Sequence, residues 1–224
     1  MQITAEMVSG KTPVHLCRLN GDCLLHTDVI YPFNHMREAA AEQGFDLQVA
    51  SGFRSYERQL AIWNAKASGQ RVLLNDTGQP IDSDSLSDTE RVLAILRWSA
   101  LPGCSRHHWG TDMDVWDAAA VPADYSLQLT PAEYALAGPF YGLSCWLDEY
   151  AGSFGFFRPY AIDLGGVAPE PWHLSYRPLA GLFEEKLDAA FVLEILDNRK
   201  LALSEAVSNS LDEILSRFIC PLSK

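Results

Sequence analysis

Long apolar runs are missing from this sequence. No stretch reaches about 18 consecutive apolar residues, the length that a membrane-spanning helix needs. Residues 1–16 also lack a basic segment followed by a long apolar one, which is the pattern of a secretory signal peptide. We therefore expect a cytoplasmic protein that does not insert into a membrane. A periplasmic location is the alternative if a leader was removed before this sequence begins.

Basic residues are scarce. The chain has 17 Lys and Arg against 29 Asp and Glu, which gives a net charge of -12. Neutralising the phosphates of a nucleic acid requires clustered Lys and Arg, so this balance argues against a nucleic-acid partner. The acidic balance favours solubility, but it identifies no substrate.

The cysteines form no disulfide framework. Their number, five, is odd, their spacing is scattered, and no C-x-x-C pair is available for zinc. We therefore expect reduced thiols, most of them buried.

The chain does contain enough apolar sequence for a core. Of its 224 residues 48% are hydrophobic, which suits one domain or one domain with an appendage. Apolar residues at helical spacing predict helices over 31–44, 55–69, 87–101 and 139–156, with Ser55 and Ser87 as N-caps. Alternating patterns predict strands over 45–51, 111–117 and 170–178, and polar stretches predict loops over 70–86 and 117–138. Residues 180–218 predict two or three further helices.

Residues 105–117, SRHHWGTDMDVWD, concentrate groups that can bind a metal. His107 and Asp114 flank Gly110, which allows a tight turn between them. Strand alternation would place Asp112 and Asp114 on one face. A catalytic zinc site uses three protein ligands and leaves the fourth position to water. His173 is a candidate third ligand, and Glu170, three residues before it, is a candidate general base. Taken singly, each of these residues is more often structural or a surface group.

Three separated motifs resemble one enzyme family. SGFRSYERQ (51–59), SRHHWGTDMD (105–114) and EPWHLSY (170–176) look like the motifs of the zinc D-Ala-D-Ala carboxypeptidases and dipeptidases, the VanY-like group whose fold is shared with the hedgehog signalling domain. The resemblance implies an α+β fold, with a small antiparallel sheet and helices packed around it. We expect a catalytic domain over 1–179 and a C-terminal helical extension over 180–224 that packs on it or on a partner subunit, which leaves a homodimer open.

The resemblance also implies roles for individual residues. One zinc ion per chain is expected on His107, Asp114 and His173, with Glu170 as general base. Arg54 is expected over the site, where a guanidinium can bind a developing oxyanion or a substrate carboxylate. Substrate contacts are implied or considered for Arg54, Gln59, Ser105, Trp172 and Tyr176. For Gln59, capping or packing is the alternative, and for the two aromatic residues it is a place in the core.

Asp112 departs from the family pattern, which has a small residue at that position. We expect it to orient a ligand from behind or to form a salt bridge with Arg54, because a fourth protein ligand would close the position that catalysis needs. His108 is expected to be structural or to support the ligands.

These observations favour a zinc metallopeptidase that releases the C-terminal D-amino acid from a peptidoglycan-type peptide, with a small peptide or a muropeptide as substrate. The motifs do not separate D,D from L,D bonds, so an L,D-carboxypeptidase acting on tetrapeptide stems remains an alternative. A non-catalytic binding module with structural zinc is a further alternative. The presence of both Glu170 and Arg54 favours the enzyme, because a binding module needs neither a base nor an oxyanion clamp.

Overall fold

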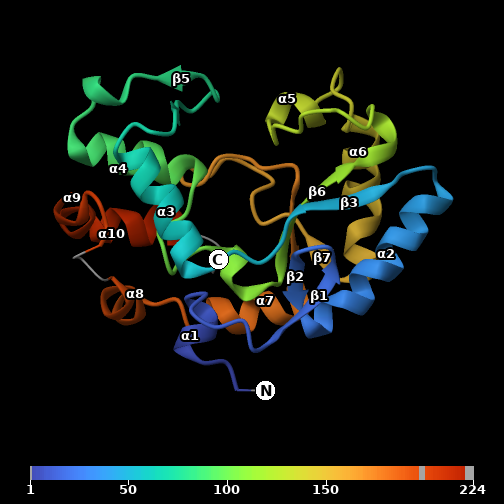
Figure 1. Cartoon of the computed structure of the whole chain (residues 1–224), viewed down its shortest axis with the longest axis horizontal. Coiled ribbons are helices and arrows are strands. Elements are labelled where there is room, and N and C mark those ends of the chain that lie inside the picture. The colour runs from blue at the N-terminus through green and yellow to red at the C-terminus, as the bar shows by residue number, and fades with distance from the viewer. Residues whose placement is uncertain (1, 197–199, 220–224) are drawn as a thin grey trace.

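A four-stranded antiparallel sheet lies at the centre of the fold (Figure 1). The computed structural model describes residues 2–196 and 200–219. The strands follow the order β3 (Leu47–Ser51), β6 (Asp112–Asp117), β8 (His173–Tyr176) and β7 (Phe156–Phe157). Helices pack around this sheet, and two separate two-stranded hairpins are also present, so the expected α+β class is confirmed.

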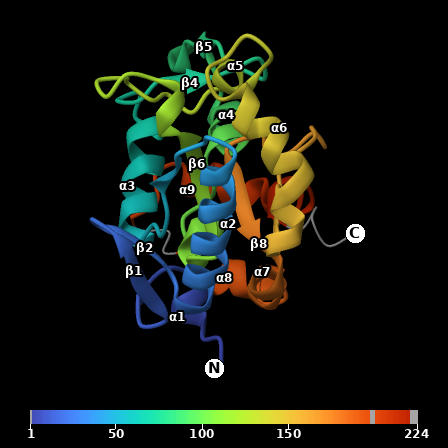
Figure 2. The same cartoon turned by 90° about the vertical axis from the view of Figure 1, so that its right-hand side faces the viewer.

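One face of the sheet is apolar. Met113 and Val115 of β6 and Leu174 of β8 are fully buried in a cluster that also includes residues of α2 (Ile30–Glu42) and α6 (Tyr141–Tyr150). Figure 2 shows these two helices lying over β6 and β8. Because side chains alternate along a strand, this packing turns the intervening residues of both strands to the opposite face.

A second core lies on the other side of the molecule. It joins α3 (Tyr56–Ala67) and α4 (Asp88–Trp98) to the C-terminal segment, and its largest buried side chains include Trp63, Ile95 and Phe183. The C-terminal helices are α7 (Arg177–Glu184), α8 (Ala189–Ile195), α9 (Ser204–Asn209) and α10 (Leu211–Ile214), followed by a π-helical turn over Leu215–Ile219. The Trp63 indole donates a hydrogen bond of 2.9 Å to the Ala202 carbonyl, so this segment packs on α3 of its own chain.

The remaining elements are short. They are α1 (Ala5–Val8), the hairpin β1 (Leu16–Asn20) with β2 (Cys23–His26), the hairpin β4 (Leu73–Leu74) with β5 (Pro80–Ile81), and α5 (Pro131–Tyr134). In the part of the chain that the structure describes, no helix combines the length and the apolarity needed to cross a membrane.

The predicted helix starts are confirmed by their caps. The Ser55 hydroxyl accepts the backbone N–H of Arg58 at 3.2 Å. At α4, Ser87 and Glu90 form a reciprocal capping box. Such caps satisfy backbone donors that the first turn of a helix leaves without partners. The helix predicted over 31–44 also ends as expected, because Gly44 takes a φ of +89°, which favours glycine.

Three expectations need correction. The helix predicted over 139–156 ends at Tyr150, because a 3-10 turn over Ala151–Phe154 and strand β7 follow. The loop predicted over 70–86 contains the β4–β5 hairpin, which Leu73 anchors with 2% exposure. The cysteines are not mostly buried: the thiols of Cys17 and Cys145 are exposed, that of Cys23 is half-buried and Cys104 is buried, whereas Cys220 lies outside the described residues.

Candidate metal centre and active site

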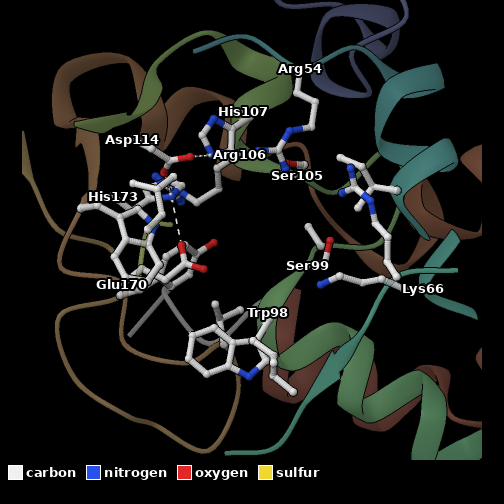
Figure 3. Close-up of a pocket in the computed structure, with 18 of the residues that line it drawn as sticks. Arg54, Lys66, Trp98, Ser99, Ser105, Arg106, His107, Asp114, Glu170 and His173 are labelled. Carbon is white, nitrogen blue, oxygen red and sulfur yellow. Dashed lines mark ion pairs between the residues drawn. The ribbon is translucent and has the colours of Figure 1, made fainter. Parts of the chain in front are cut away.

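The three predicted ligands lie together on the polar face of the sheet (Figure 3). Asp114 of β6 and His173 of β8 are directly opposite each other in the antiparallel register. His107 reaches them from a 3-10 turn over Arg106–Trp109. The candidate ligand atoms of the three residues lie within 4.8 Å of one another, and all three residues are buried. Cross-strand pairing therefore places two of these side chains together, and the turn before β6 brings in the third.

The two histidines are oriented by hydrogen bonds on their outer sides. His107 Nδ1 lies 2.9 Å from the Gly52 carbonyl, so it carries the proton and Nε2 faces Asp114 at 3.4 Å. His173 Nε2 lies 2.9 Å from Asp112 Oδ2, which turns Nδ1 toward Asp114 Oδ1 at 3.3 Å. Outer partners of this kind fix which ring nitrogen is free to bind a metal.

Two buried atoms at this centre lack hydrogen bonds. They are His173 Nδ1 and Asp114 Oδ1, which face each other. Leaving such polar atoms without a partner is costly, whereas a cation between them would satisfy both. Two imidazole nitrogens and one carboxylate are also a donor set that zinc accepts in catalytic sites. The residues present therefore fit a zinc ion.

The charges of the centre support an ionised Asp114. Burial alone would raise the pKa of this carboxyl, but the charges and hydrogen bonds of His107 and His173 outweigh it and hold the pKa below its usual range. Burial lowers the pKa of His173, and the neighbouring carboxylates of Asp112, Asp114 and Glu170 reverse that effect and raise the pKa well above its usual range. The site thus concentrates negative charge around an imidazole, an arrangement that also suits a cation.

Asp112 lies behind His173, and its salt bridge is to Arg106 and not to Arg54. Its carboxylate accepts Arg106 Nε at 2.6 Å and the Ser175 hydroxyl at 2.8 Å, in addition to His173. Burial opposes ionisation, but the Arg106 charge and the His173 hydrogen bond hold the pKa of Asp112 well below its usual range. Arg106 also forms an ion pair with Glu184 of α7. The sequence did not predict the pairing of Arg106 with Asp112, because the direction of the Arg106 side chain depends on the fold of the 105–110 turn.

His108 is a structural side chain. It is fully buried, its Nδ1 lies 2.6 Å from the Arg54 carbonyl, and its Nε2 accepts the Gly103 N–H at 3.1 Å. Burial lowers the pKa of His108 to about 3, so the ring is neutral and can make both bonds at once. His108 thereby holds the backbone of Arg54 in place.

Arg54 and Glu170 border the same cavity as the three ligands, a space of about 380 Å³. Glu170 Oε2 lies 3.2 Å from His173 Nδ1. Arg54 donates to Gln59 Oε1 at 3.0 Å and to the Ser51 hydroxyl at 3.3 Å, which fixes its guanidinium. Burial lowers the pKa of Arg54, while the charges of Asp114 and Glu170 act in the opposite direction. A base and a cation therefore flank the candidate metal position.

The predicted substrate contacts divide into two groups. Ser105 and Trp172 line the cavity. Gln59 does not: it is fully buried, and its amide donates to the Ala100 carbonyl at 2.6 Å while accepting from Arg54. Tyr176 packs in the apolar core, 5.2 Å from the Phe156 ring. Gln59 thus supports Arg54, and Tyr176 belongs to the core, because helix and strand packing direct both side chains away from the cavity.

Sequence reasoning also missed most of the other residues that line the cavity, among them Tyr160, Lys66 and Arg71. The Tyr160 ring lies 5.0 Å from the His173 ring, and burial raises the pKa of its phenol to about 12, so it is a neutral donor. Tyr160 lies in an irregular stretch that carries no periodic signal. Lys66 shares with Ile62 the face of α3 that borders the cavity, but nothing in the sequence marks this face of the helix as the one at the site.

The sequence of this chain is similar to those of known proteins. The family described as VanY, D-alanyl-D-alanine carboxypeptidase, matches residues 22–179. An uncharacterised protein of Haemophilus influenzae is 42% identical over 105 residues, which make up 45% of this chain and 72% of that protein. A D-alanyl-D-alanine carboxypeptidase of Enterococcus faecalis is 29% identical over 142 residues, 62% of this chain, and the match spans 43% of its own length.

Solved structures share the fold. VanYB in complex with D-alanine-D-alanine matches with a TM-score of 0.55 and 22% identity, over 84% of this chain and 92% of that one. A mutant of the vancomycin-resistance D,D-pentapeptidase VanY in complex with Zn(II) gives a TM-score of 0.54 and 23% identity, over 87% and 89%. The LD-carboxypeptidase LdcB gives 0.53 and 22%, over 89% and 80%. The fold shared with these proteins is the one that the three motifs predicted.

Proposed function

The chain belongs to the VanY family of D-alanyl-D-alanine carboxypeptidases, and from this premise we propose that it is a zinc metallopeptidase. Its proposed reaction is hydrolysis of the bond before a C-terminal D-amino acid in a peptidoglycan-type peptide. Relatives in solved structures bind Zn(II) or D-alanine-D-alanine, which supports both the metal and the substrate class.

The proposed metal ligands are His107, Asp114 and His173, with one zinc ion per chain. The buried atoms without hydrogen bonds, His173 Nδ1 and Asp114 Oδ1, support this assignment. A zinc ion held there supplies Lewis-acid chemistry, since it polarises a carbonyl group and acidifies water. Asp112 and the Gly52 carbonyl keep the two imidazoles in the orientation that this binding requires.

Glu170 is the proposed general base. Its carboxylate lies in the cavity beside His173, where it can accept a proton from the attacking water. As the carbon–nitrogen bond of the peptide breaks, the same carboxyl group returns that proton to the leaving amine. Arg54, fixed by Gln59 and Ser51, donates hydrogen bonds to the oxygen that becomes negative during the attack.

One observation carries this proposal: a base, a fixed cation and three convergent ligands border a single cavity. A module that only bound a partner through structural zinc would not require Glu170 and Arg54 at its metal. Catalysis by hydrolysis requires both roles.

The first test combines metal content with a panel of substrates. Zinc would be quantified in the purified chain, which would then be incubated with D-Ala-D-Ala, a pentapeptide stem ending in D-Ala-D-Ala and a tetrapeptide stem. Mass spectrometry would follow the released D-alanine. We expect one zinc per chain and cleavage of at least one of these peptides, and the peptide that is cleaved separates D,D from L,D preference. A zinc-loaded chain that cleaved none of them would refute the proposal.

A further inference from the structure

Two basic side chains border the cavity apart from the metal ligands. Lys66 comes from the last turn of α3, and Arg71 follows that helix; both line the cavity that holds Glu170 and His173. Figure 3 shows Lys66 reaching in from the side opposite His173 and Glu170. The proposed chemistry uses neither residue.

Within residues 2–196 and 200–219, neither side chain has a hydrogen-bond or ion-pair partner. The other two cations of the cavity are different. Arg106 is held by Asp112 and Glu184, and Arg54 is held by Gln59 and Ser51. Lys66 and Arg71 therefore contribute positive charge that no carboxylate of the described chain neutralises at close range.

The surroundings of Lys66 make this arrangement costly. Burial lowers the pKa of its ammonium group to about 8, and the charges of Arg71 and Arg54 act in the same direction, while Glu170 opposes them. Lys66 is half-buried, whereas Arg71 is exposed. In a chain with a net charge of -12, unpaired cations gathered at one cavity also create a local field that attracts anions.

We propose that Lys66 and Arg71 form an anion subsite that binds a carboxylate of the substrate across the cavity from the metal ligands. This inference rests on the proposed peptidase function, for which it names a recognition element. A cavity of about 380 Å³ has room for a short stretch of peptide between a carboxylate on one wall and an amide carbonyl on the other. Arg54 is less suited to this role, because the N–H groups that Gln59 and Ser51 leave free are assigned to the oxygen that becomes negative beside the metal position.

The carboxylate has two sources in a peptide. It is either the free C-terminal carboxylate of the residue to be released or an acidic group further back in the chain. Both would form charge-assisted hydrogen bonds with an ammonium and a guanidinium. Substrates that differ in one of these groups at a time separate the two sources.

The test uses the zinc-loaded full chain and the variants Lys66→Gln and Arg71→Gln. Arg58→Gln is the matched control, because Arg58 is exposed on the same helix and does not line the cavity. The substrates are an acetylated peptide ending in D-Ala-D-Ala, its C-terminal amide, and the same pair with Glu in place of Gln before the terminal dipeptide. Circular dichroism and thermal melting would verify that each variant folds.

We expect KM to rise about tenfold or more in each cavity variant, with kcat within about threefold of wild type and the control unchanged. If the subsite binds the terminal carboxylate, the wild type discriminates against the amide and the variants lose that discrimination. If it binds an acidic side chain, the discrimination that disappears is between Glu and Gln. Wild-type KM values for both variants on every peptide would overturn the subsite while leaving the peptidase standing.

A binding measurement keeps the two proposals separable if no peptide is cleaved. Isothermal titration would compare N-acetyl-D-alanine with N-acetyl-D-alaninamide on the zinc-loaded chain. If the subsite binds the terminal carboxylate, the free acid binds more tightly than the amide, and Lys66→Gln and Arg71→Gln lose that preference whereas Arg58→Gln keeps it. The Glu and Gln peptides, titrated in the same way, test the acidic side chain. A wild type that prefers neither the free acid over the amide nor Glu over Gln would refute the subsite, whatever the outcome of the activity assays.

Discussion

The two faces of the central sheet are buried for opposite reasons. Met113 and Leu174 on one face contribute apolar area, and burying such a side chain is worth roughly 1.5–3 kcal/mol. On the other face, Asp114 and His173 are charged or polar groups that burial alone disfavours. Adjacent residues of the same strand therefore have different roles: those on the apolar face stabilise the fold, and those on the polar face carry the candidate functional groups. Burial of the apolar face therefore offsets the free-energy cost of burying the polar groups, and it holds the strands that position those groups.

The largest expected effect is a loss of turnover from a substitution at the cavity, without a loss of folding stability. Glu170→Gln removes the proposed base but no ligand, so we expect kcat to fall roughly 10²- to 10⁴-fold while zinc content stays at one per chain. The assay is peptide hydrolysis together with metal analysis. Glu185→Gln, the same change at an exposed position, is the control and should match wild type. A Glu170→Gln variant with near-normal turnover would remove the base from the mechanism.

A matched change on the apolar face should do the reverse. Leu174→Ala leaves a cavity beneath β8, and we expect a loss of about 2–5 kcal/mol in the free energy of unfolding. Zinc content of the folded variant should not change, because Leu174 points away from the ligands. Leu193→Ala, at a leucine that is 60% exposed, should cost less than about 0.5 kcal/mol in the same urea titration. Equal losses in the two variants would contradict the two-face comparison.

His15 is a buried titratable group that, unlike His173, has no carboxylate of the described chain beside it to offset the effect of burial on its pKa. His15 is 2% exposed and packs beside His26, and burial lowers its pKa to about 4. Because the unfolded chain binds this proton more readily, His15 costs no stability above its unfolded pKa of about 6.5 and destabilises the fold as the pH falls from there toward 4. The expected loss approaches about 3 kcal/mol at the lower limit.

Urea unfolding of the metal-free chain between pH 7.5 and 4.5 would measure this effect. His15→Leu should have a shallower loss of stability over that range than the wild type. His35→Gln, at an exposed histidine of α2, is the control and should keep the wild-type slope. An unchanged slope in His15→Leu would mean that His15 does not drive the acid sensitivity.

The smallest expected effect concerns the layer behind the ligands. Asp112→Asn keeps the shape of the side chain but removes the charge that faces His173 Nε2. We expect zinc affinity to fall about 10- to 100-fold, as measured by competition with a chelator. Asp22→Asn, at a fully exposed carboxylate, should leave the affinity unchanged. An Asp112→Asn chain that bound zinc as tightly as wild type would show that Asp112 does not act on the ligand.

The sequence was most informative where local rules decide the structure. Alternation along β6 predicted that Asp112 and Asp114 share a face, and the hydrophilic caps Ser55 and Ser87 marked helix starts. Both follow from backbone geometry within a few residues. Three motifs then indicated that His107 and His173 belong with Asp114, and the structure brings their ligand atoms together.

Long-range packing decided the remainder. Asp112 meets Arg106 because a 3-10 turn redirects that side chain, and no spacing rule predicts the direction. Gln59 faces inward because α3 packs against the segment around Ala100, 41 positions away in sequence. Lys66 borders the cavity for the same reason. Which face of a helix meets a distant loop depends on the assembled core, and local pattern does not contain that information.

The ion pair between Arg106 and Glu184 has a practical consequence for where this protein can be divided. The family match ends at residue 179, and all three candidate ligands precede that point. A fragment that stopped there would retain every candidate ligand. It would omit Glu184, however, which is one of the two carboxylates that pair with Arg106; the other is Asp112. A fragment that keeps the surroundings of the candidate metal centre intact must therefore extend beyond the segment that the family matches and include all of α7.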